Sequence, residues 1–210
     1  MRRAGTAIPA ALVVGGILGG LAWLSDDLGY PMGLLIPANL LGVWALVAFG
    51  AGAGARTVLG GAGRGAFALL AAVGVYYLAY RLLGEGWRAA GALRAATIWG
   101  LVAVIAGPPL GFAGSVWRYR TGWARSLAIA VPAGVLIAEG VLFQAQVPNG
   151  VAARALLSAE AVAGLLLPIL LVRGARWRAL ALAGALVVAG VATVGLYVIL
   201  PALRAAADTF

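Results

Sequence analysis

Two carboxylate side chains stand inside otherwise apolar stretches of this sequence. Glu139 lies in VPAGVLIAEGVLF (131–143), and Glu160 lies in SAEAVAG (158–164). An ionisable group at membrane depth is costly and by default marks a functional site or a buried pair. A carboxylic acid in a pocket of low dielectric constant stays protonated at neutral pH and can donate its proton to a substrate. The two glutamates are therefore the candidate catalytic residues.

A structural role is the alternative for both glutamates. Glu139 would then form a salt bridge with Arg81 or Arg154, because a buried charge needs a partner. Glu160 is expected nearer to the membrane surface, where a carboxylate is easier to accommodate.

The composition leaves carboxylates as the main source of acid–base chemistry. The chain has no His and no Cys, and its 15 basic residues are all arginines. Disulfides, thiol redox chemistry, zinc or haem ligation through His or Cys, and Schiff-base lysines are therefore excluded. We expect the chemistry to need no metal and no cofactor.

The overall composition predicts an integral membrane protein. The 210 residues are 64% hydrophobic and 10% charged, with a mean hydropathy of +1.04, whereas a soluble domain is about half apolar and about a quarter charged. The net charge of +9 comes from arginines scattered between apolar segments. That pattern is typical of membrane orientation and not of nucleic-acid binding.

Seven apolar segments are each about 20 residues long, the length that crosses a membrane as a helix. They cover roughly residues 5–24, 33–53, 66–83, 95–116, 124–145, 155–172 and 179–200. We predict an all-α, polytopic membrane protein in which residues 1–210 form a single domain of seven transmembrane helices. No A-x-A-like site follows the first segment, so we expect a retained helix and not a cleaved signal peptide.

Arginines in alternate connections predict the orientation in the cell membrane. Ten lie on one side and five on the other, together with Asp26, Asp27, Glu85 and Asp208. The positive-inside rule places the N-terminus in the cytoplasm and the C-terminus outside.

Glycines and prolines predict local features of the helices. GAGAG (50–54) and GGAGRG (60–65) lack the strand and the acidic residue of a nucleotide-binding loop, so we expect helix packing and a flexible turn there. Small-xxx-small pairs let helices approach closely; they include Gly15/Gly19, Gly16/Gly20, Gly50/Gly54 and Gly107/Gly111. The pair Pro108–Pro109 is expected to bend or break the fourth helix.

The predicted topology brings polar and aromatic groups to one depth. Glu139 lies about 9 Å and Glu160 about 8 Å below the same outer surface, at 1.5 Å per helical residue. The expected substrate-binding residues at this level are Asn39, Trp44, Tyr76, Tyr77, Tyr80, Arg81 and Trp99. Asp26 and Asp27 follow the predicted first helix, either in a solvated loop or as a second acid that reaches into the site.

A carboxylic acid beside aromatic faces can protonate an alkene or epoxide and stabilise the resulting carbocation. The seven spans and intramembrane acids resemble the small integral membrane terpene cyclases of meroterpenoid and indole-alkaloid pathways. NLLGVWALVAFGAG, VGVYYLAYR, AEGVLF and SAEAVAG also look like an uncharacterised family of actinobacterial membrane proteins. The cyclase resemblance implies natural-product biosynthesis by a metal-independent isomerase acting on a prenylated, lipophilic molecule, with Glu139 as proton donor and Glu160 as its partner or final base.

Two other functions fit the same residues. Carboxylates, an arginine and broken helices also build proton-coupled transporters and substrate-capture subunits. A scaffold or subunit whose acids only pair with arginines is the third alternative.

Overall fold

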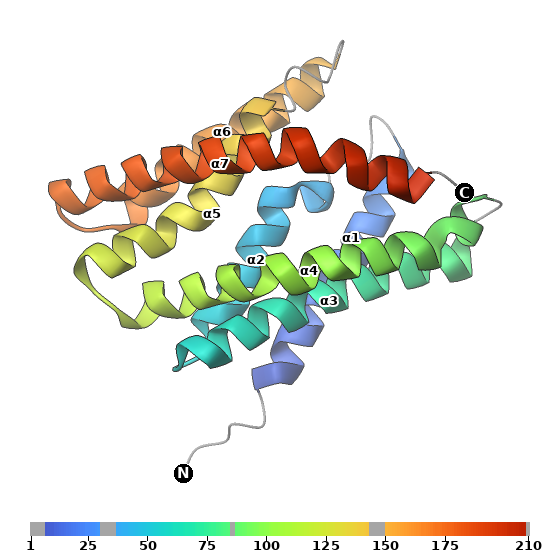
Figure 1. Ribbon diagram of the computed structural model, residues 1–210, viewed down its shortest axis with the longest axis horizontal. Helices are drawn as coiled ribbons and strands as arrows, with labels where there is room; N and C mark the ends of the chain where they lie inside the picture. Colours follow the sequence, from blue (N-terminus) through green and yellow to red (C-terminus); the bar gives the residue numbers. More distant parts are fainter. Residues whose placement is uncertain (1–6, 30–36, 85–86, 143–149, 209–210) are drawn as a thin grey trace.

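The computed structural model describes residues 7–29, 37–84, 87–142 and 150–208, and the regular secondary structure in these ranges is all helical (Figure 1). The helices are α1 (Ala7–Leu28), η3 (Pro37–Asn39, a 3₁₀ turn), α2 (Leu41–Ala53), α3 (Val58–Leu83), α4 (Trp87–Tyr119), α5 (Gly122–Leu142), α6 (Val151–Leu171) and α7 (Ala175–Asp208). The predicted all-α class is confirmed.

Six of the seven described α-helices are long and apolar enough to cross a membrane. The exception is α2, which has 13 residues and so rises only about 20 Å. The segment predicted as a second span, 33–53, thus contains a 3₁₀ turn and a short helix within its described part. Pro37 and the extended backbone of Leu40 explain why helix α2 starts only at Leu41.

The glycine-rich stretch 60–65 lies within a helix, so the flexible turn expected there is wrong. Thr57 caps α3 by accepting a hydrogen bond from the Gly60 N–H at 3.1 Å, and the helix runs on through the glycines. A Cβ atom on Gly65 would lie 2.3 Å from the Gly107 carbonyl oxygen, and one on Gly61 would lie 2.6 Å from that of Gly111. The glycines therefore let α3 and α4 pack side by side (Figure 1).

Helix α4 continues through Pro108 and Pro109, so of the bend or break predicted there the break does not occur. Each proline removes one backbone donor within the helix. The tight backbone contact of Gly107 and Gly111 with α3 supports α4 on both sides of these missing bonds.

Close packing also joins α1 to α3. Cβ atoms on Gly15 and Gly19 would lie 2.0 and 2.1 Å from the carbonyl oxygens of Ala68 and Ala72. This pair of glycines acts as the sequence predicts.

Helix α5 is the central element of the bundle. It packs on α6, α7, α4 and α2, and most of its residues from Ser126 to Gly140 are buried. Tight turns connect it to α4 and connect α6 to α7; these turns use Gly122 (φ +62°) and Gly174 (φ +89°) in the left-handed region that favours glycine. Glu139 is thus carried by the most enclosed helix.

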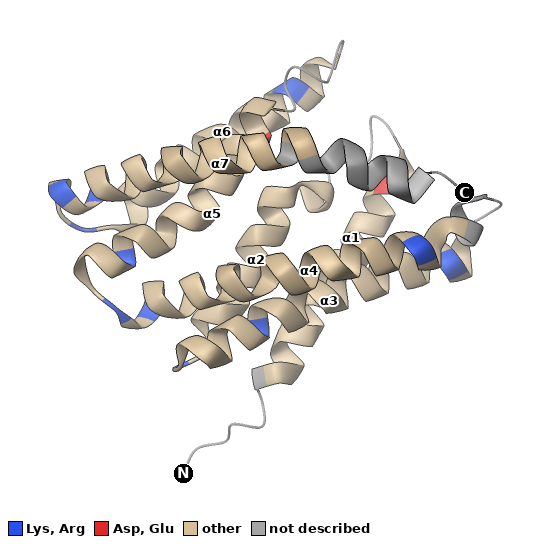
Figure 2. Cartoon of the chain, in the orientation of Figure 1, with Lys and Arg blue, Asp and Glu red and all other residues tan. Residues whose placement is uncertain are grey.

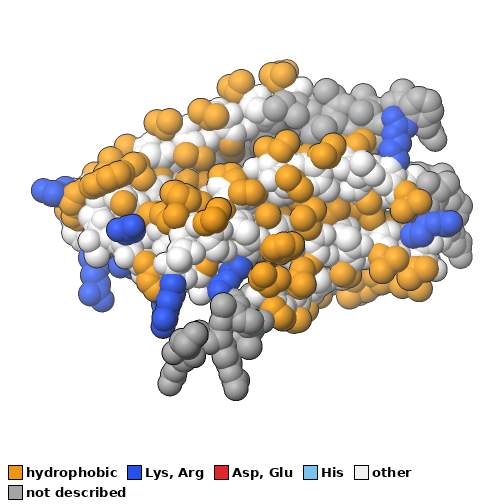
Figure 3. All heavy atoms as spheres, turned by 60° about the horizontal axis from the view of Figure 1, so that its bottom comes forward, with side chains coloured by type: hydrophobic (Ala, Val, Ile, Leu, Met, Phe, Trp, Pro, Cys, Tyr) orange, Lys and Arg blue, Asp and Glu red, His pale blue; other side chains and the backbone are white. Residues whose placement is uncertain are grey.

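The arginines are distributed unevenly between the two ends of the bundle. Figure 2 shows most of them at the end formed by the α2–α3, α4–α5 and α6–α7 connections, and Figure 3 shows an apolar surface between the two ends. The described arginines at the crowded end are Arg56, Arg64, Arg118, Arg120, Arg125, Arg173, Arg176 and Arg178, against Arg81, Arg88, Arg94, Arg154 and Arg204 on helix ends at the other. Arg2 and Arg3 lie outside the described residues.

Candidate functional site

Glu139 binds the start of α2. Its side chain is 4% exposed, and its two oxygens accept hydrogen bonds from the backbone N–H groups of Leu41 at 2.8 Å and Gly42 at 2.6 Å. These residues open α2, whose own N-cap residue, Leu40, supplies no side-chain hydrogen bond. Glu139 therefore caps a helix that is distant in sequence.

A helix that begins inside an apolar bundle needs hydrogen-bond acceptors for its first N–H groups, and Glu139 supplies them for α2. The first N–H groups of any helix lack partners within it, and an unsatisfied N–H away from water is costly. A carboxylate satisfies two of them and also interacts favourably with the positive end of the helix dipole. A salt bridge with Arg81 or Arg154 is the structural alternative for Glu139, and the hydrogen bonds that the structure gives this carboxylate are instead from the backbone of α2.

Glu160 lies against Glu139. Its side chain is 6% exposed, and its carboxyl group is within interaction range of the Glu139 carboxyl and of the Gly42 N–H. Neither Glu160 oxygen has a hydrogen-bond partner of regular geometry among the described residues. The close approach depends on Gly42, because a Cβ there would lie 2.1 Å from Glu160 Oε1. The two glutamates, predicted on adjacent helices at matching depth, thus lie next to each other.

The two carboxyl groups differ in their surroundings. Glu139 accepts two N–H bonds at a helix N-terminus, a setting that stabilises a negative charge. Glu160 has the other carboxylate as its neighbour and no arginine within the described structure that pairs with it. Two adjacent buried carboxylates without a counter-ion are strongly unfavourable when both are charged, and a proton shared by the pair removes that repulsion.

A second polar cluster joins α1, η3 and α3. Asp26 accepts hydrogen bonds from the Asn39 side chain at 2.5 Å, from the Tyr80 hydroxyl at 3.0 Å and from the Tyr76 hydroxyl. The Asn39 amide also donates to the Ala22 carbonyl at 3.1 Å. Asp26 is thus a half-buried residue of α1, and the solvated loop expected for it is wrong; its neighbour Asp27 is exposed.

One short segment, Asn39–Gly42, connects the two clusters. The side chain of Asn39 binds Asp26, and the N–H groups of Leu41 and Gly42 bind Glu139. The entry into α2 is therefore held by a carboxylate from α1 on one side and by a carboxylate from α5 on the other.

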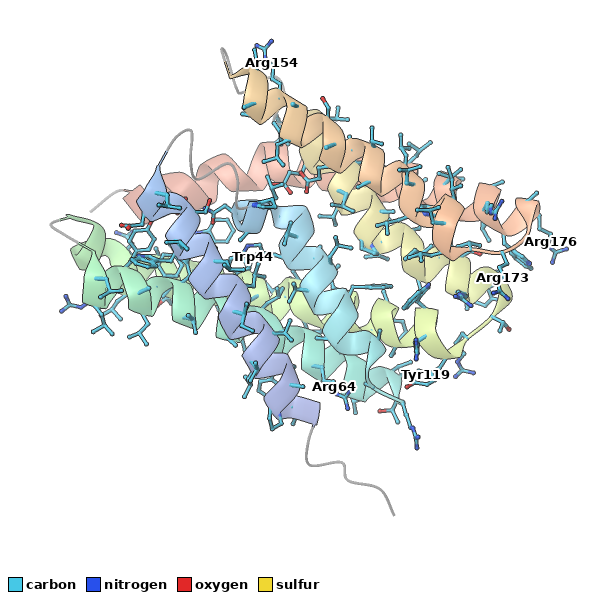
Figure 4. All side chains as sticks on the ribbon, turned by 180° about the vertical axis from the view of Figure 1, so that it is seen from behind. Trp44, Arg64, Tyr119, Arg154, Arg173 and Arg176 are labelled. Carbon is cyan, nitrogen blue, oxygen red and sulfur yellow. The ribbon has the colours of Figure 1, made fainter. Side chains whose placement is uncertain are left out.

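The predicted aromatic residues divide between these clusters. Trp44, Tyr77 and Trp99 pack on one apolar cluster with Val131 and Val135 of α5. The indole of Trp44, labelled in Figure 4, donates to the Ala38 carbonyl at 2.6 Å. Val135 precedes Glu139 by four residues, so these aromatic side chains lie along the helix face that leads to the carboxyl pair.

Tyr76 and Tyr80 lie beside Asp26, and Tyr77 connects them to the apolar cluster through an edge-to-face ring contact with Tyr76. The ring centroid of Tyr76 is 4.7 Å from that of Tyr77 and 5.0 Å from that of Tyr80. Arg81 lies exposed at the end of α3. Arg81 and Asp27 are thus not gathered with the other predicted site residues.

Leu41 and Gly42 are site residues that the sequence did not reveal. They take part through backbone N–H groups, which carry no side-chain signature. The signal was indirect: Pro37 and Asn39 interrupt an apolar run before a glycine, a composition that favours a helix start. Among the described residues, no group of three His, Cys, Asp or Glu side chains is placed to hold a metal ion.

Comparisons with known proteins give a family without an assigned activity. No curated protein and no solved structure matches the chain. A family model described as a family of unknown function, DUF6518, matches residues 1–202. The chain therefore belongs to the DUF6518 family.

Proposed function

We propose that this protein is a multi-pass protein of the cell membrane that cyclises a prenylated, lipophilic substrate by acid catalysis at the Glu139–Glu160 pair. The observation that supports it is the buried carboxyl pair, in which one member is fastened to a helix N-terminus and the other has no donor. Such a pair holds a proton at a depth that a lipid substrate reaches from the bilayer.

The contacts favour Glu160 as the proton donor, which reverses the roles expected from the sequence. Glu139 needs its negative charge to cap α2. Glu160 has no such hydrogen bond of regular geometry among the described residues, so it is the member of the pair that can carry the proton and donate it to the substrate. The Glu160 O–H bond would break as a C–H bond forms on an alkene carbon. The alkene's π electrons make that bond and leave a carbocation, whose charge the adjacent carboxylates balance.

The aromatic side chains would serve the later steps. Ring faces of Trp44, Tyr77 and Trp99 stabilise a cation within the apolar cluster. A second alkene of the same substrate closes the ring, and loss of a proton to the Glu160 carboxylate restores the enzyme. Atoms and electrons balance without any metal or cofactor, since the product is an isomer of the substrate.

Solvent deuterium tests this proposal. The protein in liposomes made in D₂O would be incubated with prenylated aromatic lipids, with and without a terminal epoxide, and the products analysed by chromatography and mass spectrometry. From the substrate without the epoxide we expect a cyclic product that carries one deuterium on carbon in place of one hydrogen. From the epoxide the deuterium goes to an exchangeable hydroxyl group, so the cyclic isomer itself is the readout. Both turnovers should be lost in Glu160→Gln. Glu139→Gln should also reduce turnover, through a weakened α2 cap. Wild-type turnover in a folded Glu160→Gln variant would disprove the assignment.

Proton-coupled transport is the second candidate, because α2 begins inside the bundle with its N-terminus directed at carboxylates. Interrupted helices of this kind hold substrates and ions in secondary transporters. Proton uptake into liposomes that depends on an added solute, without any chemical product, would favour transport. If no cyclic product forms in the deuterium assay and no added solute changes proton uptake into the liposomes, only the scaffold role would be left.

A further inference from the structure

The arginine-rich end of the bundle carries a second set of polar groups, far from the carboxyl pair. The α4–α5 and α6–α7 turns lie together there, as the positions of Tyr119, Arg173 and Arg176 in Figure 4 show. Their arginines are Arg118, Arg120, Arg125, Arg173, Arg176 and Arg178. The sequence holds no Asp or Glu from 86 to 138 or from 161 to 207, so these elements supply no acid to neutralise them.

Two buried donors at this end lack acceptors. Trp117 lies on the last turns of α4 and Arg125 on the first turn of α5, and the Arg125 guanidinium carbon is 5.6 Å from the centroid of the indole. The Trp117 Nε1–H and the Arg125 Nε–H are both buried without a partner among the described residues. An unsatisfied buried donor costs about 1–3 kcal/mol, so an acceptor at this position would stabilise both groups.

The surroundings distinguish these donors from their neighbours. Arg178 is satisfied, because its Nε donates to the Val172 carbonyl at 2.9 Å, and Arg176 stacks on Trp177 at 4.0 Å. Arg125 remains half-buried, and Trp117 packs on an apolar cluster with Phe49, whose ring centroid is 5.5 Å from that of the indole. The two donors also lie at adjoining ends of two helices that are long and apolar enough to cross a membrane. A ligand that fits here needs both a negatively charged acceptor and an apolar part.

We propose that Trp117 and Arg125 bind the phosphodiester of an anionic phospholipid, whose acyl chains extend along the apolar surface between the two ends of the bundle (Figure 3). The phosphate oxygens accept from the indole and guanidinium N–H groups after a rotation of Arg125, which lies over the indole. Basic pockets between membrane helices recognise lipid headgroups in this way. The surrounding arginines add attraction that does not depend on the detailed geometry.

Native mass spectrometry of the full-length protein tests the site. The protein, extracted in a mild detergent, would be titrated with phosphatidylglycerol and, separately, with phosphatidylcholine. We expect preferential binding of phosphatidylglycerol. Arg125→Gln should weaken its affinity about fivefold or more, because one arginine near an anionic lipid contributes about that factor to binding. Trp117→Phe keeps the aromatic ring and removes only the N–H, and it should weaken binding by at least about threefold.

Arg120→Gln is the matched control. It removes the same charge from the same turn, but Arg120 is exposed, so we expect no more than about a twofold effect. Equal losses in Arg120→Gln and Arg125→Gln would overturn the proposal in favour of unspecific surface charge. Competition by inorganic phosphate at the same concentration as the lipid would overturn it in favour of a free-anion site. If Arg125→Gln does not fold, Trp117→Phe alone decides, and wild-type lipid preference in that variant contradicts the site.

Discussion

The carboxylate of Glu139 lies 2.6 Å from the backbone nitrogen of Gly42 and so fastens the end of α5 to the start of α2. The two residues are 97 positions apart in the sequence. A second bond, from the Leu41 N–H at 2.8 Å, uses the other oxygen of the same carboxylate. Glu139 therefore has a structural role in addition to any chemical role. Substitutions are needed that distinguish its effect on stability from its effect on activity.

Replacing Glu139 should destabilise the protein more than replacing Glu160. Glu139→Gln keeps one acceptor oxygen but faces the second α2 N–H with an NH₂ group, so we expect a loss of about 1–3 kcal/mol. Glu139→Leu removes both acceptors and should cost more. Thermal unfolding in detergent micelles, followed by circular dichroism, measures both.

Glu160→Gln is the control for these variants. It is a buried glutamate of the neighbouring helix whose oxygens have no regular hydrogen bond among the described residues. We expect its unfolding temperature to stay close to the wild-type value. If Glu139→Leu unfolded at the same temperature as Glu160→Gln, the capping role would be refuted.

Gly42→Ala should disrupt the contact between α2 and the carboxyl pair. The added Cβ would lie 2.1 Å from Glu160 Oε1 and 2.4 Å from Leu136 Cδ2, and overpacking of this kind costs about 1–3 kcal/mol. Gly50→Ala on the same helix meets nothing within 4 Å and should be neutral or stabilising by up to about 1 kcal/mol. Unfolding temperatures of the two variants should therefore move in different directions, and matching shifts would contradict the close approach at Gly42.

The sequence predicts the six long apolar helices well, because hydrophobic length is a local property. It also predicts that Glu139 and Glu160 meet, since adjacent antiparallel helices bring equal depths together. The cap on α2 could not be predicted, because its donors are backbone N–H groups whose exposure depends on where α2 starts. The same holds for Asp26, whose environment is set by Tyr76 and Tyr80 on another helix.

The errors at glycine and proline have one physical cause. Both residues weaken an isolated helix, so 60–65 and Pro108–Pro109 predict interruptions. In the bundle the glycines of both helices, which have no side chain, allow α3 and α4 to approach closely. The packing energy of this contact outweighs the local preference against helix. Local propensity therefore predicts helix ends in the wrong places where close packing between two helices offsets the weak helix preference of their residues.

The Asp26 cluster should show strong coupling between its members. Tyr76→Phe and Asp26→Asn each remove part of the hydrogen bond between them, and bonds to charged groups contribute about 1.5–3 kcal/mol. The double variant should be less destabilised than the sum of the single ones, by about 1 kcal/mol or more. A double-mutant cycle from chemical unfolding measures this term, with Tyr119→Phe, exposed at the opposite end of the bundle, as the uncoupled control. Additive effects of Tyr76→Phe and Asp26→Asn would show that the cluster does not act as a unit.

The orientation of the bundle is testable because the chain contains no cysteine. Single cysteines can be introduced at exposed positions of opposite ends, as Asp27→Cys and Arg120→Cys. The excess of arginines at the end that carries Arg120 predicts that this end is cytoplasmic. A membrane-impermeant maleimide added to intact cells should therefore label Asp27→Cys and not Arg120→Cys, and permeabilised cells should label both. Labelling of Arg120→Cys in intact cells would reverse the orientation and, with it, the membrane face from which the Asp26 cluster is reached.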